Sequence, residues 1–174
     1  MVKDKHTYIT GGNSEDEHFG ADEVLDGERT VCNNETCNTY NMLKLSRRLF
    51  VITGDKKYAD YYETTLINAI MSSQDHKTGL TMYFQPMASG YQKVFGTLEN
   101  SFWCCTGSGM ENFTKLQDSI YFKGRNVIAV NQYLASKAAG DGYVIEQTGD
   151  LSKSDTMTFK VSGDKVTFLS LIHI

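Results

Sequence analysis

Four residues from two distant segments carry the side chains of a metal site. Glu35 and Cys37 stand two positions apart, and Cys104 and Cys105 are adjacent within the segment ENSFWCCTGSGMEN (99–112). Adjacent cysteines rarely form a disulfide with each other, because the ring that closes is strained. Three thiols and one carboxylate match the number and the type of ligands in a tetrahedral zinc site. The two segments therefore predict bound Zn2+.

The same cysteines allow other interpretations. Each thiol alone is more often a buried, unreactive side chain that packs as a small hydrophobic residue. The vicinal pair is also compatible with a redox-active dithiol, which predicts reversible oxidation without a metal. The remaining cysteine, Cys32, is expected to be a bystander. A zinc-held thiolate beside a carboxylic acid would suit displacement at carbon, with the acid protonating a leaving oxygen, and the nearby polar and aromatic residues would suit a sugar.

Two helices are expected to position the first pair of ligands. Apolar residues at spacings of three and four predict a helix over 36–53, and Gly54 ends it. Asp55 can cap a second helix over about 56–73. The broad apolar stripes of both helices favour packing on two neighbours, as in a toroid. Glu35 and Cys37 stand at the front of the first helix, where the helix dipole favours anionic ligands.

The rest of the chain changes from helical to extended. The segments 80–84 and 90–97 are predicted to be extended, the vicinal cysteines follow on a Gly-rich turn, and a helix begins near Gly107 with Glu111 in its first turn. After residue 118, short β-prone segments alternate with turns, at 120–122, 127–134, 143–147, 157–161 and 166–169. The predicted fold is mainly α with a β segment: a helical domain over 1–119 and the beginning of a β-sandwich over 120–174.

Composition excludes several classes of protein. With 40% hydrophobic and 22% charged residues, the 174-residue chain is expected to fold rather than to be disordered. The net charge of −4 argues against nucleic acid or an anionic membrane as the partner. No apolar run reaches the length of a membrane span. The opening residues, MVKDKHTYITGG, lack the apolar core of a signal peptide.

Four motifs resemble a known enzyme family. GGNSEDEHF (11–19), ETCNTYNMLKLSRRLF (35–50), YADYYETTLINAI (58–70) and ENSFWCCTGSGMEN (99–112) resemble segments of the β-L-arabinofuranosidases of glycoside hydrolase families 127 and 146, in the same order. The form of the first motif is closer to family 146. The resemblance implies a six-hairpin (α/α)6 barrel followed by β-sandwich domains, and a retaining mechanism.

The resemblance also implies a role for particular residues. Cys104 would be the nucleophile that forms a thioglycosyl intermediate, and Glu35, Cys37, Cys104 and Cys105 would bind the zinc. The acid/base carboxylate falls on Glu17, with Glu23 as the second choice. Three further positions match the sugar pocket, or lie close to it: Glu63, Tyr83 and His18.

The predicted function is the release of β-L-arabinofuranose from plant-type glycans or glycoproteins. The alternative is a non-catalytic, carbohydrate-binding helical module in which the zinc is purely structural, because a site with four protein ligands normally leaves no open position. Both ends of the sequence appear interrupted, and the apolar tail 165–174 ends without a turn.

We therefore expect a fragment that lacks the first half of its barrel and is inactive and aggregation-prone alone. Two interpretations of the apolar tail stay open: an interrupted strand, or residues that do not belong to the native protein. The sequence leaves the compartment open. The resemblance implies a bacterial protein of the cytoplasm, the periplasm or the extracellular space.

Overall fold

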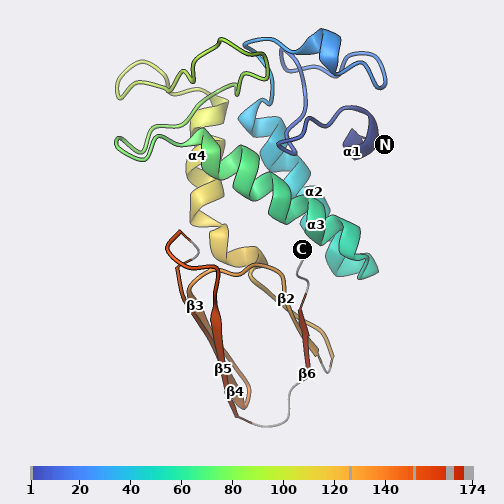
Figure 1. The fold of residues 1–174 in the computed structure, drawn as a ribbon, viewed down its shortest axis with the longest axis vertical. Helices are drawn as coiled ribbons and strands as arrows, with labels where there is room; N and C mark the ends of the chain where they lie inside the picture. Colours follow the sequence, from blue (N-terminus) through green and yellow to red (C-terminus); the bar gives the residue numbers. More distant parts are fainter. Residues whose placement is uncertain (1, 126, 151, 164–166, 171–174) are drawn as a thin grey trace. The chain divides into compact units, whose positions relative to one another are not determined.

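The chain forms a helical part and a β part. The computed structural model describes residues 2–125, 127–150, 152–163 and 167–170 (Figure 1). Its internal contacts divide the chain into two compact units, Met1–Lys115 and Leu116–Ile174. The first unit contains the long helices and several long loops, and the second contains the strands. The predicted fold class, mainly α with a β segment, is confirmed at this level.

Helices α2 and α3 are the framework of the first unit, and they form a helical hairpin (Figure 1). Helix α2 spans Thr36–Thr53, as predicted, and ends at Gly54, which has a φ of 67° and donates its N–H to the Phe50 carbonyl. Helix α3 spans Lys56–Thr65, and the Asp55 side chain accepts a hydrogen bond from the Lys57 N–H at its start. A left-handed glycine followed by a capping aspartate makes this tight turn possible.

The second predicted helix, over 56–73, ends where expected, but only its first part is an α-helix. After α3 the chain forms a π-helix, η2, over Leu66–Ile70 and then a 3-10 turn, η3, over Met71–Ser73. The remaining helices of this unit are α1 at Val2–Lys5, the 3-10 turn η1 at Asp26–Glu28, and α4 at Cys104–Thr114. None of the helices in the described ranges is both long and apolar enough to cross a membrane.

Two predictions about the segment before and within α4 are wrong. The vicinal cysteines do not lie on a turn, because α4 begins at Cys104 itself, and Glu111 is in a later turn of the helix. The segments 80–84 and 90–97 are loops that contribute only the single bridges Gln74↔Thr81 and Met82↔Phe95. Their β-prone residues form no ladder because their backbone groups bond to scattered partners, such as the Ser73 carbonyl and the Thr36 N–H.

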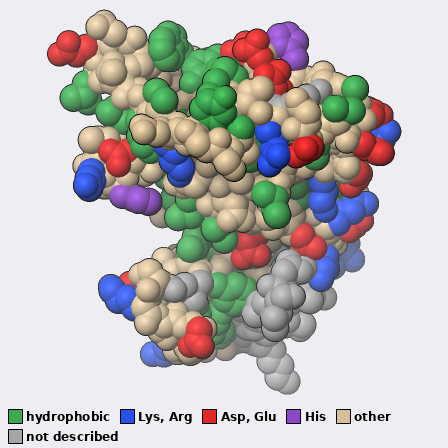
Figure 2. Space-filling model, turned by 45° about the horizontal axis from the view of Figure 1, so that its top comes forward, with side chains coloured by type: hydrophobic (Ala, Val, Ile, Leu, Met, Phe, Trp, Pro, Cys, Tyr) green, Lys and Arg blue, Asp and Glu red, His purple; other side chains and the backbone are tan. Residues whose placement is uncertain are grey.

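The core of the first unit is formed by side chains of α2, η2, α4 and the loop that precedes α4. Leu43, Ile70, Met82 and Cys105 are almost completely buried there. Other apolar side chains of α2 are exposed to solvent, and Ile52 is 72% exposed. Figure 2 shows further hydrophobic side chains at the surface of the face that carries the long loops. The α2–α3 hairpin therefore buries one face and leaves another face free.

Buried amides hold the loops that lead into α2. The Asn33 side chain donates to the Tyr8 hydroxyl at 2.9 Å, and the Asn33 carbonyl accepts from the Gln85 N–H at 2.7 Å. The Tyr61 hydroxyl of α3 donates to the Gly11 carbonyl at 2.7 Å. Because buried polar groups are costly when unpaired, these bonds fix the loops against the helical hairpin.

Within its described residues, the second unit contains two small sheets and a 3-10 turn, η4, at Leu116–Ser119. The first sheet has the order β1–β2–β6, with strands at Tyr121–Lys123, Val127–Val130 and Thr167–Ser170, and β2 pairs parallel with β6. The second sheet is antiparallel, β3–β4–β5, with strands at Ser136–Gly140, Tyr143–Thr148 and Thr158–Gly163.

Most strands lie close to their predicted positions, but β3 was not predicted and β2 ends earlier than expected. Gln147 connects the two sheets, since its side chain donates to the Tyr121 hydroxyl at 2.7 Å and to the Gln132 carbonyl at 3.1 Å. Residues 165, 166 and 171–174 of the apolar tail, which is either an interrupted strand or a non-native end by the sequence, lie outside the described residues.

Replacement by alanine is expected to have opposite effects on protein stability at two glycines of α4, Gly107 and Gly109. A Cβ on Gly109 would lie 2.6 Å from Thr81 Oγ1, whereas a Cβ on Gly107 would meet no atom within 4 Å. Gly107→Ala should stabilise the protein by up to about 1 kcal/mol, because alanine favours helix. Gly109→Ala should destabilise it by roughly 1–3 kcal/mol, because the loop that carries Thr81 must move. Denaturant unfolding of the two variants checks the signs, and destabilisation by Gly107→Ala would contradict this account.

Candidate active site

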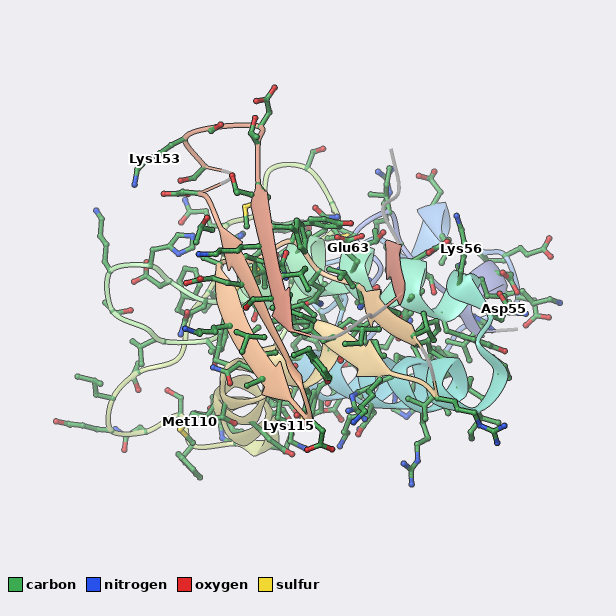
Figure 3. All side chains as sticks on the ribbon, turned by 90° about the horizontal axis from the view of Figure 1, so that it is seen from below. Asp55, Lys56, Glu63, Met110, Lys115 and Lys153 are labelled. Carbon is green, nitrogen blue, oxygen red and sulfur yellow. The ribbon has the colours of Figure 1, made fainter. Side chains whose placement is uncertain are left out.

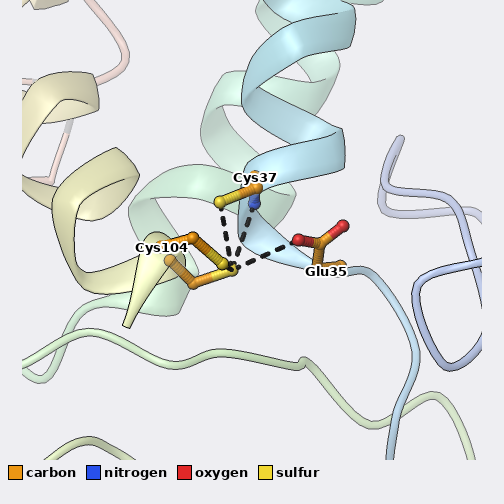
Figure 4. A group of neighbouring side chains, drawn as sticks. Glu35, Cys37 and Cys104 are labelled. Atoms are coloured by element: carbon orange, nitrogen blue, oxygen red, sulfur yellow. Dashed lines mark hydrogen bonds between the residues drawn. The ribbon is translucent and has the colours of Figure 1, made fainter. Parts of the chain in front are cut away.

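The four predicted metal ligands lie together in the first unit. Their ligand atoms are all within 4.8 Å of one another. Cys105 Sγ lies 3.4 Å from Cys37 Sγ, 4.0 Å from Cys104 Sγ and 3.6 Å from Glu35 Oε1. Figure 4 shows Glu35 and Cys37, at the beginning of one helix, facing the vicinal cysteines at the beginning of another. All four cysteines of the chain are free thiols.

Two helix N-termini position this cluster. Helix α2 begins directly after Glu35, and α4 begins at Cys104. The Cys37 N–H, in the first turn of α2, donates to Cys105 Sγ at 3.4 Å. The free N–H groups of a helix N-terminus carry a partial positive charge, which favours thiolates and carboxylates. The dipoles of α2 and α4 therefore both favour the anionic forms of the carboxyl group and the three thiols in this cluster.

The three distances from Cys105 Sγ are compatible with a tetrahedral zinc ion. Zn–S bonds of about 2.3 Å in a tetrahedron place two sulfur ligands about 3.8 Å apart, and an oxygen ligand slightly closer to a sulfur. The distances of 3.4, 4.0 and 3.6 Å from Cys105 Sγ agree with that arrangement, and the other ligand pairs lie within 4.8 Å. Burial raises the pKa values of Cys105, Cys37 and Glu35. A divalent cation would offset this penalty, since metal binding deprotonates thiol ligands.

Tyr83 connects the cluster to Glu17. The Tyr83 hydroxyl donates to Glu17 Oε1 and lies 3.2 Å from Cys104 Sγ. The hydrogen bonds to Cys104 and to Glu17 raise the pKa of Tyr83, so its hydroxyl stays protonated. Its backbone is fixed by the Thr36 N–H, which donates to the Tyr83 carbonyl at 3.0 Å. The structure therefore places one carboxylate and one exposed thiol on either side of a single phenol.

A strained turn presents Glu17. Glu15 and His18 exchange two backbone hydrogen bonds of 2.9 Å, and the two residues between them have positive φ, 45° at Asp16 and 67° at Glu17. This is the geometry of a type I′ hairpin turn, in which glycine is usual at the second position. A glutamate there costs backbone strain, but Glu23 has the same φ of 67°, so this strain does not distinguish the two carboxylates. The Asp16 N–H also donates to the Cys32 carbonyl at 2.9 Å, which holds the turn beside the segment that leads to Glu35.

Glu23, the second choice for the acid/base, is placed differently. Its N–H donates to the Lys5 carbonyl at 3.1 Å, and the neighbouring Asp22 forms an ion pair with Lys5. Like Glu17, it is not a member of the metal-binding group and lines neither of the cavities at the cysteines, so only the contact with Tyr83 separates the two carboxylates. Between the two carboxylates, Glu17 is the one that the structure places in contact with Tyr83.

Two other predicted residues do not contact the cluster in the described interactions. His18 is exposed, and its Nδ1 lies 2.5 Å from the Asp16 carbonyl oxygen. Glu63 lies about two turns into α3, as Figure 3 shows with Asp55 and Lys56 at the start of that helix. Neither residue lines the cavities beside Cys104 and Cys105. A role for them in binding sugar stays a prediction.

Sequence reasoning missed Ser108, whose Oγ lies 3.0 Å from Cys37 Sγ. Ser108 stands one helical turn after Cys104, so the signal was available once a helix starting at Cys104 was considered. Sequence reasoning also did not group the aromatic residues Tyr83, Phe84 and Trp103 as one wall of the site. Tyr83, Phe84, Trp103 and Cys104 line an open cavity of about 560 Å3, and Trp103 meets the edge of Tyr83 with ring centroids 5.9 Å apart.

Comparison with solved structures shows which proteins share this fold. The chain is similar to a GH127 β-L-arabinofuranosidase from Geobacillus stearothermophilus T6, with a TM-score of 0.75 and 22% identity, over 94% of this chain and 28% of that one. It is also similar to a GH127 β-arabinofuranosidase with a TM-score of 0.78 and 25% identity, over 92% of this chain and 26% of that one. The chain shares the fold of part of these proteins, and it spans little more than a quarter of their length.

The sequence profile described as the GH127 catalytic domain of β-L-arabinofuranosidases matches residues 1–118. The chain therefore belongs to the GH127 β-L-arabinofuranosidase family, as its motifs indicated. Comparison with curated protein sequences finds no match. The predicted closer likeness to family 146 has no support in these comparisons.

Proposed function

We propose that this chain is part of a retaining glycoside hydrolase that releases β-L-arabinofuranose from plant-type glycans. The observation that carries the proposal is the position of Tyr83, whose hydroxyl contacts both the Glu17 carboxylate and Cys104 Sγ. Membership of the GH127 family supports a carbohydrate substrate. The three side chains provide a nucleophile, an acid/base and a group that orients them, which together are what a double displacement requires.

In the first step, Cys104 Sγ attacks the anomeric carbon as a thiolate. The bond from that carbon to the leaving oxygen breaks, and the Glu17 carboxylic acid gives its proton to this oxygen. The product is a thioglycoside on Cys104 and a free alcohol. The Tyr83 hydroxyl, bonded to one Glu17 oxygen, leaves the other oxygen free to carry the proton. Cys104 is exposed, as a nucleophile must be to reach a substrate.

In the second step, the Glu17 carboxylate accepts a proton from water while the water oxygen attacks the same carbon. The carbon–sulfur bond breaks and the Cys104 thiolate is restored. Two displacements at one carbon retain its configuration. Zn2+, when bound by Glu35, Cys37, Cys104 and Cys105, supplies positive charge that favours the thiolate form of its cysteine ligands.

The two parts of the chain have different roles in this proposal. Residues 1–119 form the C-terminal part of an (α/α)6 toroid, and 120–174 form the beginning of a β-sandwich. The uncovered apolar face of α2, which includes Ile52, supports packing against helices of the rest of the toroid. Glu63 and His18 then contact the sugar with groups supplied by that missing part. The fragment alone is inactive, and tests of turnover need the complete enzyme.

Zinc content is the direct test of the metal site. One zinc per chain is expected by elemental analysis of protein purified under reducing conditions, and Cys37→Ser should lose it. Cys32→Ser is the matched control, because Cys32 lies outside the ligand group. Burial raises the pKa values of Cys37 and Cys105, so protons compete with the metal and zinc should dissociate increasingly as pH falls. A folded wild-type protein without metal would contradict the assignment.

A further inference from the structure

The Ser108 side chain makes a contact unlike those of other hydroxyl residues in the helices. Within a helix, serine and threonine often bond to a carbonyl of the preceding turn. Thr53 and Thr114 do so, each with a hydrogen bond of 2.8 Å. In its described hydrogen bond, the Ser108 hydroxyl lies 3.0 Å from Cys37 Sγ, which belongs to a different helix. The hydroxyl is thus directed at the sulfur of a proposed metal ligand.

Ser108 shares one face of α4 with the vicinal cysteines. It follows Cys104 by four residues and Cys105 by three, and these spacings place side chains on the same side of a helix. Cys37 faces them from the first turn of α2, and its N–H donates to Cys105 Sγ at 3.4 Å. Cys37 is therefore bonded to α4 twice, through its backbone N–H and through its sulfur.

The direction of the hydrogen bond between Ser108 and Cys37 depends on the state of the sulfur. A cysteine that binds zinc is a thiolate, which can only accept a hydrogen bond. The Ser108 hydroxyl is then the donor. Because Cys37 is half-buried, its charge is partly removed from water, and a donor beside it compensates for that loss. Groups that hydrogen-bond to a metal ligand also fix its orientation and strengthen metal binding.

We propose that Ser108 is a positioning residue that retains Cys37 on the zinc by donating a hydrogen bond to its thiolate. This inference rests on the proposed function, because it requires the metal site described there. Ser108 is not itself a member of the ligand group. Its role is to keep Cys37 as a permanent ligand, while Cys104, the exposed thiol, is the one that reacts.

The zinc affinity of the complete enzyme tests the inference. Competition for Zn2+ with a chelating dye, at constant pH and under reducing conditions, gives the Kd. Ser108→Ala should raise the Kd about 10- to 100-fold, the usual effect of losing a group that hydrogen-bonds to a metal ligand. Ser108→Thr keeps the hydroxyl and should restore most of the affinity. Thr114→Ala is the matched control, because it removes a hydroxyl from the same helix that bonds only locally, to the Glu111 carbonyl, among the described hydrogen bonds.

Cobalt distinguishes a hydrogen bond to the sulfur from a general loosening of the helix. Co2+ bound in place of zinc absorbs light through sulfur-to-metal charge transfer, and a hydrogen bond to the sulfur moves this band to higher energy. Ser108→Ala should therefore shift the band to longer wavelength, and Thr114→Ala should leave it unchanged. Thermal unfolding of the metal-free protein checks that Ser108→Ala still folds, as expected because alanine favours helix.

The outcomes separate this inference from the proposed function. If the wild type binds zinc and Ser108→Ala binds it equally well, with an unshifted cobalt band, the inference is overturned while the proposed function stands. If the zinc-loaded wild type cleaves no arabinofuranoside, but Ser108→Ala weakens zinc binding and shifts the band, the proposed function fails and the inference holds. A folded wild type that binds no zinc overturns the inference together with the metal site.

Discussion

Replacing Cys104 by serine should lower the turnover of an arabinofuranoside by the complete enzyme at least about 1,000-fold, since the attacking group is removed. A serine hydroxyl is a far weaker nucleophile than a thiolate at neutral pH. Cys104 is the exposed member of the vicinal pair, whereas Cys105 is only 1% exposed. Of the two adjacent thiols, only Cys104 can reach a substrate in the open cavity.

The experiment must distinguish loss of the nucleophile from loss of a metal ligand. Zinc content of Cys104→Ser, measured beside its activity, shows whether the metal remains. Intact-mass analysis of wild-type enzyme quenched during turnover should show one added pentosyl group, and peptide mapping should place it on Cys104. Cys32→Ser should be active and labelled like the wild type. Activity retained in Cys104→Ser, or a sugar attached elsewhere, would refute the assignment.

Glu17→Gln should reduce turnover by roughly 100- to 10,000-fold, the usual contribution of general acid–base catalysis. The amide cannot give a proton to the leaving oxygen or take one from water. It still accepts a hydrogen bond from the Tyr83 hydroxyl, so the geometry around Cys104 should persist. Because Glu17 is outside the metal-binding group, zinc content should not change.

This variant also separates the two functions that the sequence leaves open. A non-catalytic, carbohydrate-binding module with a structural zinc would be scarcely affected by Glu17→Gln. In the enzyme, the loss should be greater for a substrate with a poor leaving alcohol than for one with an acidic phenol, because the phenol needs less protonation. Glu23→Gln is the matched control, since the described hydrogen bonds join Tyr83 to Glu17 and not to Glu23. If Glu23→Gln removed activity and Glu17→Gln did not, the acid/base roles would be exchanged.

Local sequence signals determined the helical hairpin and the donor set. The bounds of α2 follow from apolar periodicity and from Gly54, and the next helix starts where Asp55 caps it. These signals act within a few residues, so they can be read without the fold. The donor set of three thiols and a carboxylate could be read in the same way, because zinc chemistry depends on ligand type and number. The family motifs added the expected roles of Cys104 and Glu17.

Contacts between distant segments decided the rest. The choice between Glu17 and Glu23 depends on which loop reaches Tyr83, and the strained turn at Asp16 and Glu17 opposes the local preference for glycine there. The start of α4 at Cys104, three residues before the predicted one, accompanies the close packing of Gly109 on Thr81. A cavity of about 520 Å3 is lined by Val31 and by residues of the segments 81–86, 91–97 and 101–106, which no periodicity connects. Such features are determined by tertiary packing, because the interactions that stabilise them join residues far apart in the chain.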